Sequence, residues 1–446
     1  MDALIYLLAF LVAVGLLVTV HEFGHYLIAR LLGVKVLRFS VGFGRPLWLR
    51  RAGADQTEYV IAAIPLGGYV KMLDEREGEV APGEAHRAFN RQSYRVRAAI
   101  VVAGAAFNFA FAILAWWGLY LHGLPGLRPL VGEVRAASPA AVAGVRAGEE
   151  IVAVNGEVTP TLASVRLALI KAWAAREPAL LELEREGARV QRELALAELP
   201  ESEGGISLDA SLGIVAPRPP ATLGQVLPDG VAQAAGLQAG DRVLAVAGVP
   251  VRDWQELAAA LAWHPGERIT LDVQRKARQL AITLTPAVRE VQGQRRGYIG
   301  VAPDMVALRA TEQYGPVAAL GAALRQTADM SLLTLRMLGR MLTGSASLKN
   351  VSGPVSIAQY AGESAKAGWL PYVQILALIS VSLGVLNLLP VPLLDGGHLL
   401  YYALEILRRK PLSERALEIG NQLGLGLLLA LMGLAIYNDI VRLMVS

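Results

Sequence analysis

The stretch HEFGH at residues 21–25 lies inside a long apolar segment of the chain. From Ala3 to Val20 there is no charged residue, so the segment is long enough to cross a bilayer as a helix. Residues four apart share one face of a helix, and His21 and His25 can therefore bind the same metal ion. Glu22 lies beside them, where a carboxylate acts as the general base for a water molecule on that metal.

Two readings of this motif remain open at this point. An HExxH pattern arises by chance in some soluble helices. Ionisable side chains inside a membrane span are costly, however, and are expected there only where they have a function. A catalytic zinc site has three protein ligands and one open position, so two histidines alone are not enough. The chain has no cysteine, and the third ligand must therefore be another His, Asp or Glu.

The composition is typical of a membrane protein that carries soluble parts. Of the 446 residues, 54% are hydrophobic and 18% are charged, and the mean hydropathy is +0.42. This is too apolar for an ordinary soluble protein and too charged for one that lies wholly in the bilayer. The absence of cysteine excludes disulfides. The apolar composition predicts that the chain lies in a lipid bilayer. The net charge of +4 is small and no nucleic-acid-binding pattern is present, so we expect no nucleic-acid partner.

Four apolar stretches are predicted to span the membrane as helices. The second of them ends in Trp116, Trp117 and Tyr120, which is typical of an aromatic belt at a membrane interface. The predicted spans are residues 1–31, 98–121, 371–398 and 419–440.

Basic residues indicate how these spans are oriented. Residues 32–97 and 399–418 contain clusters of Lys and Arg, and short loops rich in these residues stay in the cytoplasm. The N-terminus, residues 122–370 and the C-terminus are then outside, which is the periplasm if the membrane is a bacterial inner membrane. At about 1.5 Å per residue, His21 lies roughly 27 Å from the outer start of its helix, so the metal site is predicted near the cytoplasmic side.

The cytoplasmic region 32–97 is predicted to contain a membrane-associated β-hairpin. Lys35–Phe43 and Glu58–Ile64 are rich in Val, Ile and Phe, and turn residues lie between them. A glycine turn, Gly67-Gly68-Tyr69, follows. The hairpin is either a plain surface element or an open strand edge that captures an extended peptide by strand addition, and the residues alone do not decide between these.

The outer region contains an internal repeat. The sequence AGVRAGEEIVAVNG at 143–156 recurs as AGLQAGDRVLAVAG at 235–248, an offset that corresponds to one small domain. A helical pattern follows each copy, at Ala163–Ala174 and at Trp254–Trp263. Alternating strands come next, at Ala179–Glu184 in the first copy and at Arg268–Gln274 in the second.

The repeat resembles the core of bacterial PDZ domains. Two tandem α+β PDZ domains are therefore expected at 127–213 and 214–302. The resemblance implies that they bind the ends of peptides, although such a fold also occurs as a spacer with an idle groove. In the first copy Glu149-Glu150 stands where Gly-Asp is usual. Residues 315–350 after the repeat are predicted to form an amphipathic, interfacial helical region.

The end of the third span provides a candidate for the missing ligand. Residues 387–398 read NLLPVPLLDGGH, and this end of the span is cytoplasmic in the predicted orientation. Asp395 therefore reaches the same depth as His21 and His25. His398 is a competing ligand, and Asp395 could also be no more than a helix-ending Asp-Gly turn. We prefer Asp395 because a carboxylate completes a site with two histidines, as in metalloproteases.

HEFGH in the first span together with N-x-x-P-x-P-x-L-D-G in the third resembles the site-2 proteases, zinc metalloproteases that cut within the membrane. The resemblance covers essentially the whole chain, including the stretch GYVKMLDE at 68–75, and is to members with two PDZ domains. It implies Zn²⁺ bound by His21, His25 and Asp395, with Glu22 as the catalytic acid and base. It further implies that Asn387 positions the substrate.

The same resemblance implies what the chain acts on. Strands near Gly67, Gly68 and Tyr69 would present the substrate as an edge strand, and the PDZ pair would exclude substrates with bulky outer domains. The implied substrates are single-span membrane proteins, such as an anti-sigma factor already cut outside, and remnant signal peptides. The activity would be regulated intramembrane proteolysis in an envelope stress response.

Two other classes of function deserve comparison with this one. A membrane scaffold would use PDZ domains to recruit partners and would hold a structural metal, but such a site closes with four ligands and has no use for Glu22. A metal transporter would have ionisable residues along a path across the bilayer, whereas those of this chain cluster at one depth.

Overall fold

The computed structural model describes residues 2–196, 211–291, 293–345, 347–410 and 412–445. The chain forms two compact units, Met1–Leu124 with Gln313–Ser446 and Pro125–Glu312. All candidate metal-site residues belong to the first unit, and both copies of the sequence repeat belong to the second. Part of the predicted first PDZ domain, 197–210, lies outside the described residues.

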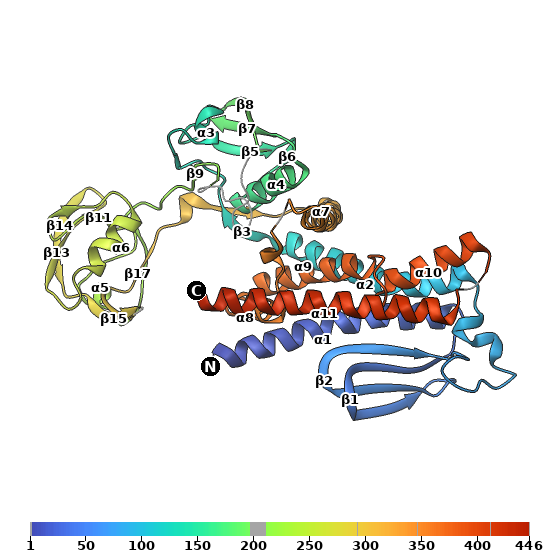
Figure 1. Ribbon diagram of the computed structural model, residues 1–446. Helices are drawn as coiled ribbons and strands as arrows, with labels where there is room; N and C mark the ends of the chain where they lie inside the picture. The colour runs from blue at the N-terminus through green and yellow to red at the C-terminus, as the bar shows by residue number, and fades with distance from the viewer. Residues whose placement is uncertain (1, 197–210, 292, 346, 411, 446) are drawn as a thin grey trace. The chain divides into compact units, whose positions relative to one another are not determined.

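In the described part of the first unit, four helices are long and apolar enough to cross a membrane. They correspond to the four predicted spans, and Figure 1 shows them from blue α1 to red α11. α1 packs along α2, and α2 packs along α9. The helices are α1 (Asp2–Leu31), α2 (Tyr94–His122), α9 (Trp369–Asn387) and α11 (Glu414–Val445).

The ends of α2 follow from its local sequence. The Ser93 side chain accepts a hydrogen bond from the backbone N–H of Val96, which caps the first turn. At the other end, Gly123 adopts a φ of 95°, and its N–H donates to the carbonyl of Leu119. The helix is therefore delimited by its own caps and starts before the apolar stretch at 98–121.

The third predicted span, 371–398, is not a single helix. α9 ends at Asn387, and the following residues include Pro390 and Pro392, which cannot continue a regular helix. A separate helix, α10 (Asp395–Arg408), begins at Asp395 itself. The expected break near the prolines is present, but the predicted bound at 398 is wrong because the LDG motif starts a new helix.

Residues 36–72 form a small sheet from two long strands, β1 (Val36–Ala52) and β2 (Thr57–Met72), where the hairpin was predicted. Ser40 is paired with both Tyr69 and Val60, so the strands fold back on themselves. Residues 68–72 pair only with the first part of β1 and form an edge of this sheet. Two short 3-10 helices, η1 (Ala85–Arg87) and η2 (Phe89–Arg91), lead on to α2.

The predicted amphipathic region contains α7 (Pro316–Leu342), which packs against α2 and α9, and η4 (Leu348–Asn350). A helix that the sequence analysis did not predict, α8 (Pro354–Ala367), follows and packs against α1. The Asp439 carboxylate of α11 accepts hydrogen bonds from the backbone N–H groups at the start of α8, at 3.0 Å from Gly353 and 2.9 Å from Val355. α8 therefore links the first and last membrane helices.

The two repeats in the second unit have the same topology. Each contains a four-stranded sheet, with the orders β6-β5-β7-β8 and β12-β11-β13-β14. The predicted helices and strands of both copies are present. The first copy contains β5 (Glu150–Val154), β6 (Glu157–Val158), α4 (Leu162–Ala175), β7 (Ala179–Arg185) and β8 (Ala188–Leu194). The second contains β11 (Arg242–Val246), β12 (Val249–Pro250), α6 (Trp254–Ala262), β13 (Ile269–Arg275) and β14 (Arg278–Leu284).

Short elements complete the second unit around these sheets. The strands β3 and β18, β4 and β9, β10 and β17, and β15 and β16 form four two-stranded ladders. The elements are β3 (Leu124–Leu127), β4 (Glu133–Val134), α3 (Pro139–Val142), β9 (Ile214–Val215), β10 (Leu223–Val226), α5 (Val231–Ala234), β15 (Ala287–Val291), β16 (Gln294–Tyr298), β17 (Val301–Pro303), η3 (Val306–Leu308) and β18 (Arg309–Glu312).

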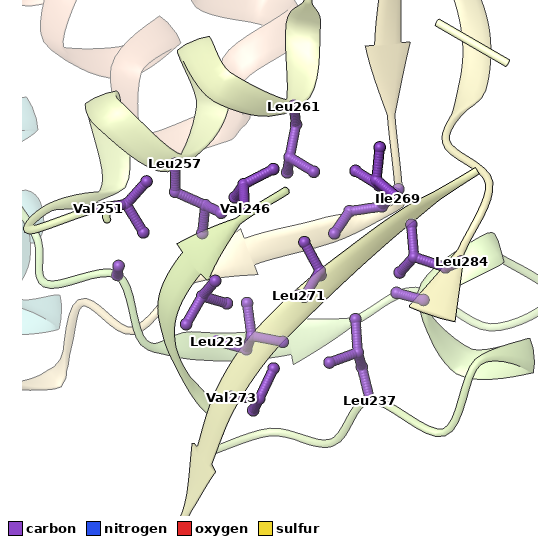
Figure 2. Packing of buried hydrophobic residues seen from close by; sticks show 14 residues of the cluster. Leu223, Leu237, Val246, Val251, Leu257, Leu261, Ile269, Leu271, Val273 and Leu284 are labelled. Atoms are coloured by element: carbon purple, nitrogen blue, oxygen red, sulfur yellow. The ribbon is translucent and has the colours of Figure 1, made fainter. Parts of the chain in front are cut away.

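The second copy has a continuous hydrophobic core of its own. Figure 2 shows Leu257 of α6 above Leu271 of β13 and Leu223 of β10, and all three are fully buried. Alternate residues of β13 point into this core, as expected for a sheet with one face buried. The copy therefore has the interior of a small folded domain.

The structure agrees with the register in which 143–156 was aligned with 235–248, and it corrects the expected departure at Glu149-Glu150. Glu149 takes the place of Asp241, because each carboxylate accepts a hydrogen bond from the backbone N–H three residues earlier. The acceptor is 2.8 Å from Arg146 N in the first copy and 2.9 Å from Gln238 N in the second. The expected departure at Glu149-Glu150 is thus a change from Asp to Glu after a shared glycine, and the local turn is kept.

Candidate metal centre

His21 and His25 lie one turn apart on α1, with their Nε2 atoms 3.2 Å from each other. The glycine between them lets α2 come close at this level. A Cβ atom on Gly24 would lie 2.4 Å from the carbonyl oxygen of Ala103 on α2, which no side chain permits. The HEFGH stretch therefore combines two potential ligands with a close contact between helices.

Asp395, the first residue of α10, completes the group. Its Oδ2 lies 3.2 Å from Nε2 of His21 and 3.4 Å from Nε2 of His25. The three potential ligand atoms lie within 4.8 Å of one another. Oδ2 is buried and accepts no hydrogen bond from any described residue. A buried carboxylate oxygen that faces two imidazoles in this way fits a bound cation, and two histidines with one carboxylate suit zinc.

The loop before α10 places Asp395 at this point. Gly396 and Gly397 lie against the loop backbone, because added Cβ atoms would be 2.1 Å from Leu389 O and 2.4 Å from Val391 O. Leu393 adopts a φ of 76°, a conformation that non-glycine residues rarely take and that is often found at functional sites. The residues DGG are therefore required by the tight packing of this loop as well as by the carboxylate.

Residues of α2 contact the imidazole rings of both histidines. Nδ1 of His25 is 2.8 Å from the carbonyl oxygen of Ile100, and Nδ1 of His21 is 3.2 Å from the side-chain amide of Asn108. Between them, a Cβ on Gly104 would lie 2.4 Å from Nε2 of His25. These three residues follow each other at intervals of four and share one face of α2.

The sequence analysis did not identify these α2 residues. The available signal was an asparagine inside an uncharged span, four residues after a glycine. Such polar residues in a membrane segment generally face the interior of the helix bundle.

The other predicted site residues surround a cavity of about 370 Å³ next to the three potential ligands. Glu22, Tyr69 and Asn387 line it, and so does His398. His398 is absent from the group of converging ligand atoms, which contains Asp395 instead.

Gly68 and Gly67 lie on the neighbouring sheet. A Cβ on Gly68 would be 3.2 Å from Cγ of Glu22, so the edge strand passes directly beside the proposed base. Gly67 has a φ of 152°, and a Cβ there would lie 2.1 Å from the ring of Phe43. The Phe43 ring in turn stacks on Tyr69, with centroids 6.2 Å apart. Gly67 is therefore favoured at this point of the edge, both by its backbone conformation and by the closeness of the Phe43 ring.

Arg97 joins α10 to α2 next to Tyr402, which also lines the cavity. Its guanidinium lies over the rings of Tyr94 and Tyr402, 4.6 and 4.7 Å from their centroids. It is also 3.8 Å from the carboxylate of Glu405, and both side chains are largely buried. These contacts hold the helix that begins at Asp395 against the helix that contacts both histidines.

Comparison with known proteins shows the family to which the chain belongs. Residues 9–431 match peptidase family M50. The chain is 44% identical to "Regulator of sigma-E protease RseP" of Escherichia coli (strain K12) over 449 residues, which cover 98% of each chain. It is 40% identical to the "Putative zinc metalloprotease" of Vibrio cholerae serotype O1 over 452 residues, 99% of this chain and all of the other.

Proposed function

The chain belongs to peptidase family M50, the site-2 proteases, and from this premise we propose that it hydrolyses peptide bonds within the membrane-spanning segments of single-span proteins. Membership makes the chain a zinc-dependent metalloprotease. The observation that carries the proposal is the convergence of His21, His25 and Asp395 beside Glu22, in a cavity among membrane helices.

In the proposed mechanism His21, His25 and Asp395 would hold the zinc ion. When bound, the ion would supply Lewis acidity, which lowers the pKa of water and polarises a carbonyl group. The Glu22 carboxylate accepts a proton from the attacking water and donates it to the nitrogen of the leaving amine. General acid–base action of this kind is typically worth about 10²–10⁴-fold in rate.

The edge of the β1–β2 sheet is the proposed guide for the substrate. A helix keeps its peptide bonds hydrogen-bonded and out of reach, so a membrane segment must become extended before it is cut. Residues 68–72 offer an unpaired strand edge beside Glu22, to which an extended segment can add as a further strand. Tyr69, held by a 3.1 Å hydrogen bond from Arg38, and Asn387 at the end of α9 would contact the segment in the cavity.

We extend this proposal to location, partners and pathway. The proposed location is a bacterial inner membrane, and the basic loops favour the orientation in which the repeats are periplasmic and the site lies near the cytoplasmic side. The repeats are proposed PDZ domains that bind peptide ends and exclude substrates with bulky outer domains. Since a relative carries the name of a sigma-E regulator, the proposed substrates are an anti-sigma factor already cut outside and remnant signal peptides, in an envelope stress response.

The decisive experiment compares the wild type with Glu22→Gln in a cleavage assay on a single-span peptide, with zinc measured in both proteins. The amide has almost the size of the carboxylate but cannot accept a proton. We expect one zinc per chain in both proteins and cleavage by the wild type alone. Substantial cleavage by the variant would contradict the metalloprotease mechanism, and zinc without cleavage in both would favour a scaffold with a structural metal.

The filtering role of the repeats can be tested separately. The two chain segments that connect the repeats to the first unit start from neighbouring positions. Tyr314 N donates to Tyr120 O at 3.1 Å, and the Gln313 side chain donates to Leu121 O at 2.9 Å, so the two chain connections lie side by side. Replacing residues 125–312 by a short linker should therefore leave the first unit intact. We expect the shortened protein to cut an untrimmed substrate that the full chain rejects; equal rejection by both would contradict the filter.

A further inference from the structure

Asn108 is a buried polar residue beside the candidate metal centre, and only one end of its amide has a hydrogen-bond partner among the described residues. Its side chain is fully buried in α2, and its Nδ2 atom lies 3.2 Å from Nδ1 of His21. Its Oδ1 atom accepts no hydrogen bond from any residue that the structure describes. A buried acceptor without a donor is unfavourable by about 1–3 kcal/mol, so this arrangement calls for an explanation.

The chemistry of the histidines restricts what Asn108 can do. His21 turns Nε2 toward Asp395, 3.2 Å away, so Nε2 is the nitrogen available to a metal. A neutral imidazole has one N–H, and if Nε2 is to bind a metal, Nδ1 must carry the proton. His25 meets this condition, because its Nδ1–H can donate to the carbonyl of Ile100 at 2.8 Å.

For His21 the same condition requires an acceptor next to Nδ1. An amide nitrogen is a donor, and two donors that face each other repel. The oxygen and nitrogen of an amide have nearly the same shape, so a rotation of the Asn108 amide by 180° brings Oδ1 to Nδ1 of His21. The rotation gives the buried oxygen a donor and leaves Nε2 free. The amide nitrogen then takes the position that Oδ1 had.

The backbone of Asn108 is held in place from another side. The Ser380 hydroxyl of α9 donates to the Asn108 carbonyl at 2.8 Å, and both residues are fully buried. α9 leads to the loop that places Asp395. Asn108 therefore lies where the helix with the two histidines meets the helix that leads to the third potential ligand.

We propose that Asn108 is a positioning residue for His21: its amide oxygen accepts the Nδ1–H of the imidazole and so keeps Nε2 free and directed at the metal. The inference rests on the proposed function, since it assumes that His21 is a zinc ligand. Outer-shell acceptors of this kind orient metal-bound histidines and raise their basicity, and their loss typically lowers metal affinity by about 10–100-fold.

The test measures zinc affinity of the purified full chain by competition with a chromophoric chelator. Asn108→Leu has a similar volume but no acceptor, and we expect its zinc affinity to fall about 10–100-fold. Asn108→Asp keeps an acceptor for Nδ1–H, and its affinity should stay within about threefold of the wild type, as in carboxylate–histidine–zinc arrangements. Asn421→Leu is the matched control, because it makes the same change at an exposed position of α11.

A second measurement needs no variant at Asn108. In histidine-labelled protein, the ¹⁵N shifts should show His21 protonated at Nδ1, with the signal assigned through His21→Gln. Protonation at Nε2 would overturn the inference, and so would wild-type zinc affinity in Asn108→Leu or equal losses in the Leu and Asp variants. If the wild type itself binds no zinc, the proposed function fails; if it binds zinc but Asn108→Leu binds equally well, only the role of Asn108 fails.

Discussion

Asp395 and His398 are three residues apart, and both border the cavity, yet their positions relative to His21 and His25 differ. A carboxylate oxygen of Asp395 lies within 3.4 Å of both Nε2 atoms, whereas His398 is outside the converging group. The DGGH sequence contains two plausible ligands, and the path of the preceding loop determines which of them faces the two histidines. Asp395 is therefore the proposed ligand, and His398 faces the space in which a substrate would lie.

Replacing each of these two residues by alanine tests that assignment. Asp395→Ala should lower zinc affinity by more than about 100-fold, because a direct ligand contributes more than an outer-shell partner. His398→Ala should stay within about tenfold of the wild type by the same comparison. Chelator competition on the purified variants measures both. A larger loss for His398→Ala would show that the wrong side chain has been assigned.

The closeness of α1 and α2 depends on two glycines, one on each helix. Gly24 lies against the backbone of Ala103, and Gly104 lies against the rings of both histidines. The candidate metal centre thus depends on a close helix contact, which is possible only where neither helix has a side chain in the way. An apolar span with alanine at these positions would still enter a membrane, but it would separate the imidazoles.

Gly104→Ala should therefore damage the site without damaging the helix. The new Cβ would lie 2.4 Å from Nε2 of His25 and 2.7 Å from Cε1 of His21, so the rings must move. We expect zinc affinity to fall by at least about tenfold, in the range of outer-shell changes. Gly118→Ala is the control on the same helix, since nothing lies within 4 Å of its added Cβ. Equal zinc affinity in the two variants would contradict this account.

In the second copy of the repeat, a buried ion pair links the turn before β11 to β13. Arg275 donates from Nε and Nη2 to the two oxygens of Asp241, both at 2.7 Å. Burial alone would raise the pKa of Asp241, but the Arg275 guanidinium and the Gln238 N–H outweigh it and hold that pKa below its ordinary value of 3.8. The carboxylate is inaccessible to solvent, so its partners determine its charge.

This ion pair predicts how the stability of the second copy changes with pH. Because the folded pKa of Asp241 is lowered, its stabilisation is complete above pH 3.8 and is lost as pH falls through the folded value. Asp241→Asn should destabilise the copy by about 3 kcal/mol at pH 7 and remove this dependence. Hydrogen exchange of β11 and β13, corrected for intrinsic rates, measures both effects. Asp272→Asn, an exposed change on β13, should alter neither.

In the first unit, the start of α1 and the end of α11 meet at one helix, α8. Tyr6, near the start of α1, donates to Glu363 of α8, and Asp439, near the end of α11, caps the start of α8. Since α1 and α11 both contact α8 with these ends, the two ends lie close together, as the predicted orientation with both termini outside requires. The candidate metal-site residues of α1 and the β2 edge beside Glu22 lie near the other end of α1 from Tyr6.

Labelling of single cysteines in this cysteine-free chain tests the orientation. Ala54→Cys in the β1–β2 turn and Ala188→Cys at the start of β8 are matched exposed positions. With a membrane-impermeant reagent applied from outside to intact cells, we expect labelling at Ala188→Cys only, and labelling at Ala54→Cys only after lysis. Labelling of both in intact cells would contradict four spans with outer repeats and would remove the argument for the depth of the metal site.

Local features of the chain were enough to predict much of this protein. Apolar length predicts the four membrane helices, alternation and turn residues predict the hairpin and the strands of the repeat, and HEFGH predicts two of the potential ligands. Each of these signals acts over a few residues, through helix periodicity, hydropathy or turn conformation. The helix α8 was missed because its sequence is neither apolar enough for a span nor separated from α7 by an obvious change in composition.

The sequence favoured Asp395 over His398 as the third potential ligand, but only the tertiary structure brings the distant groups together. That Asp395 and not His398 faces the two imidazoles depends on a loop bent by two prolines and packed through Gly396 and Gly397. That Ile100 and Asn108 contact the histidines depends on how closely α2 approaches α1, which Gly24 and Gly104 permit. Such contacts join residues about 75 to 370 positions apart, and no local pattern records a distance of that kind because it results from packing of the whole helix bundle.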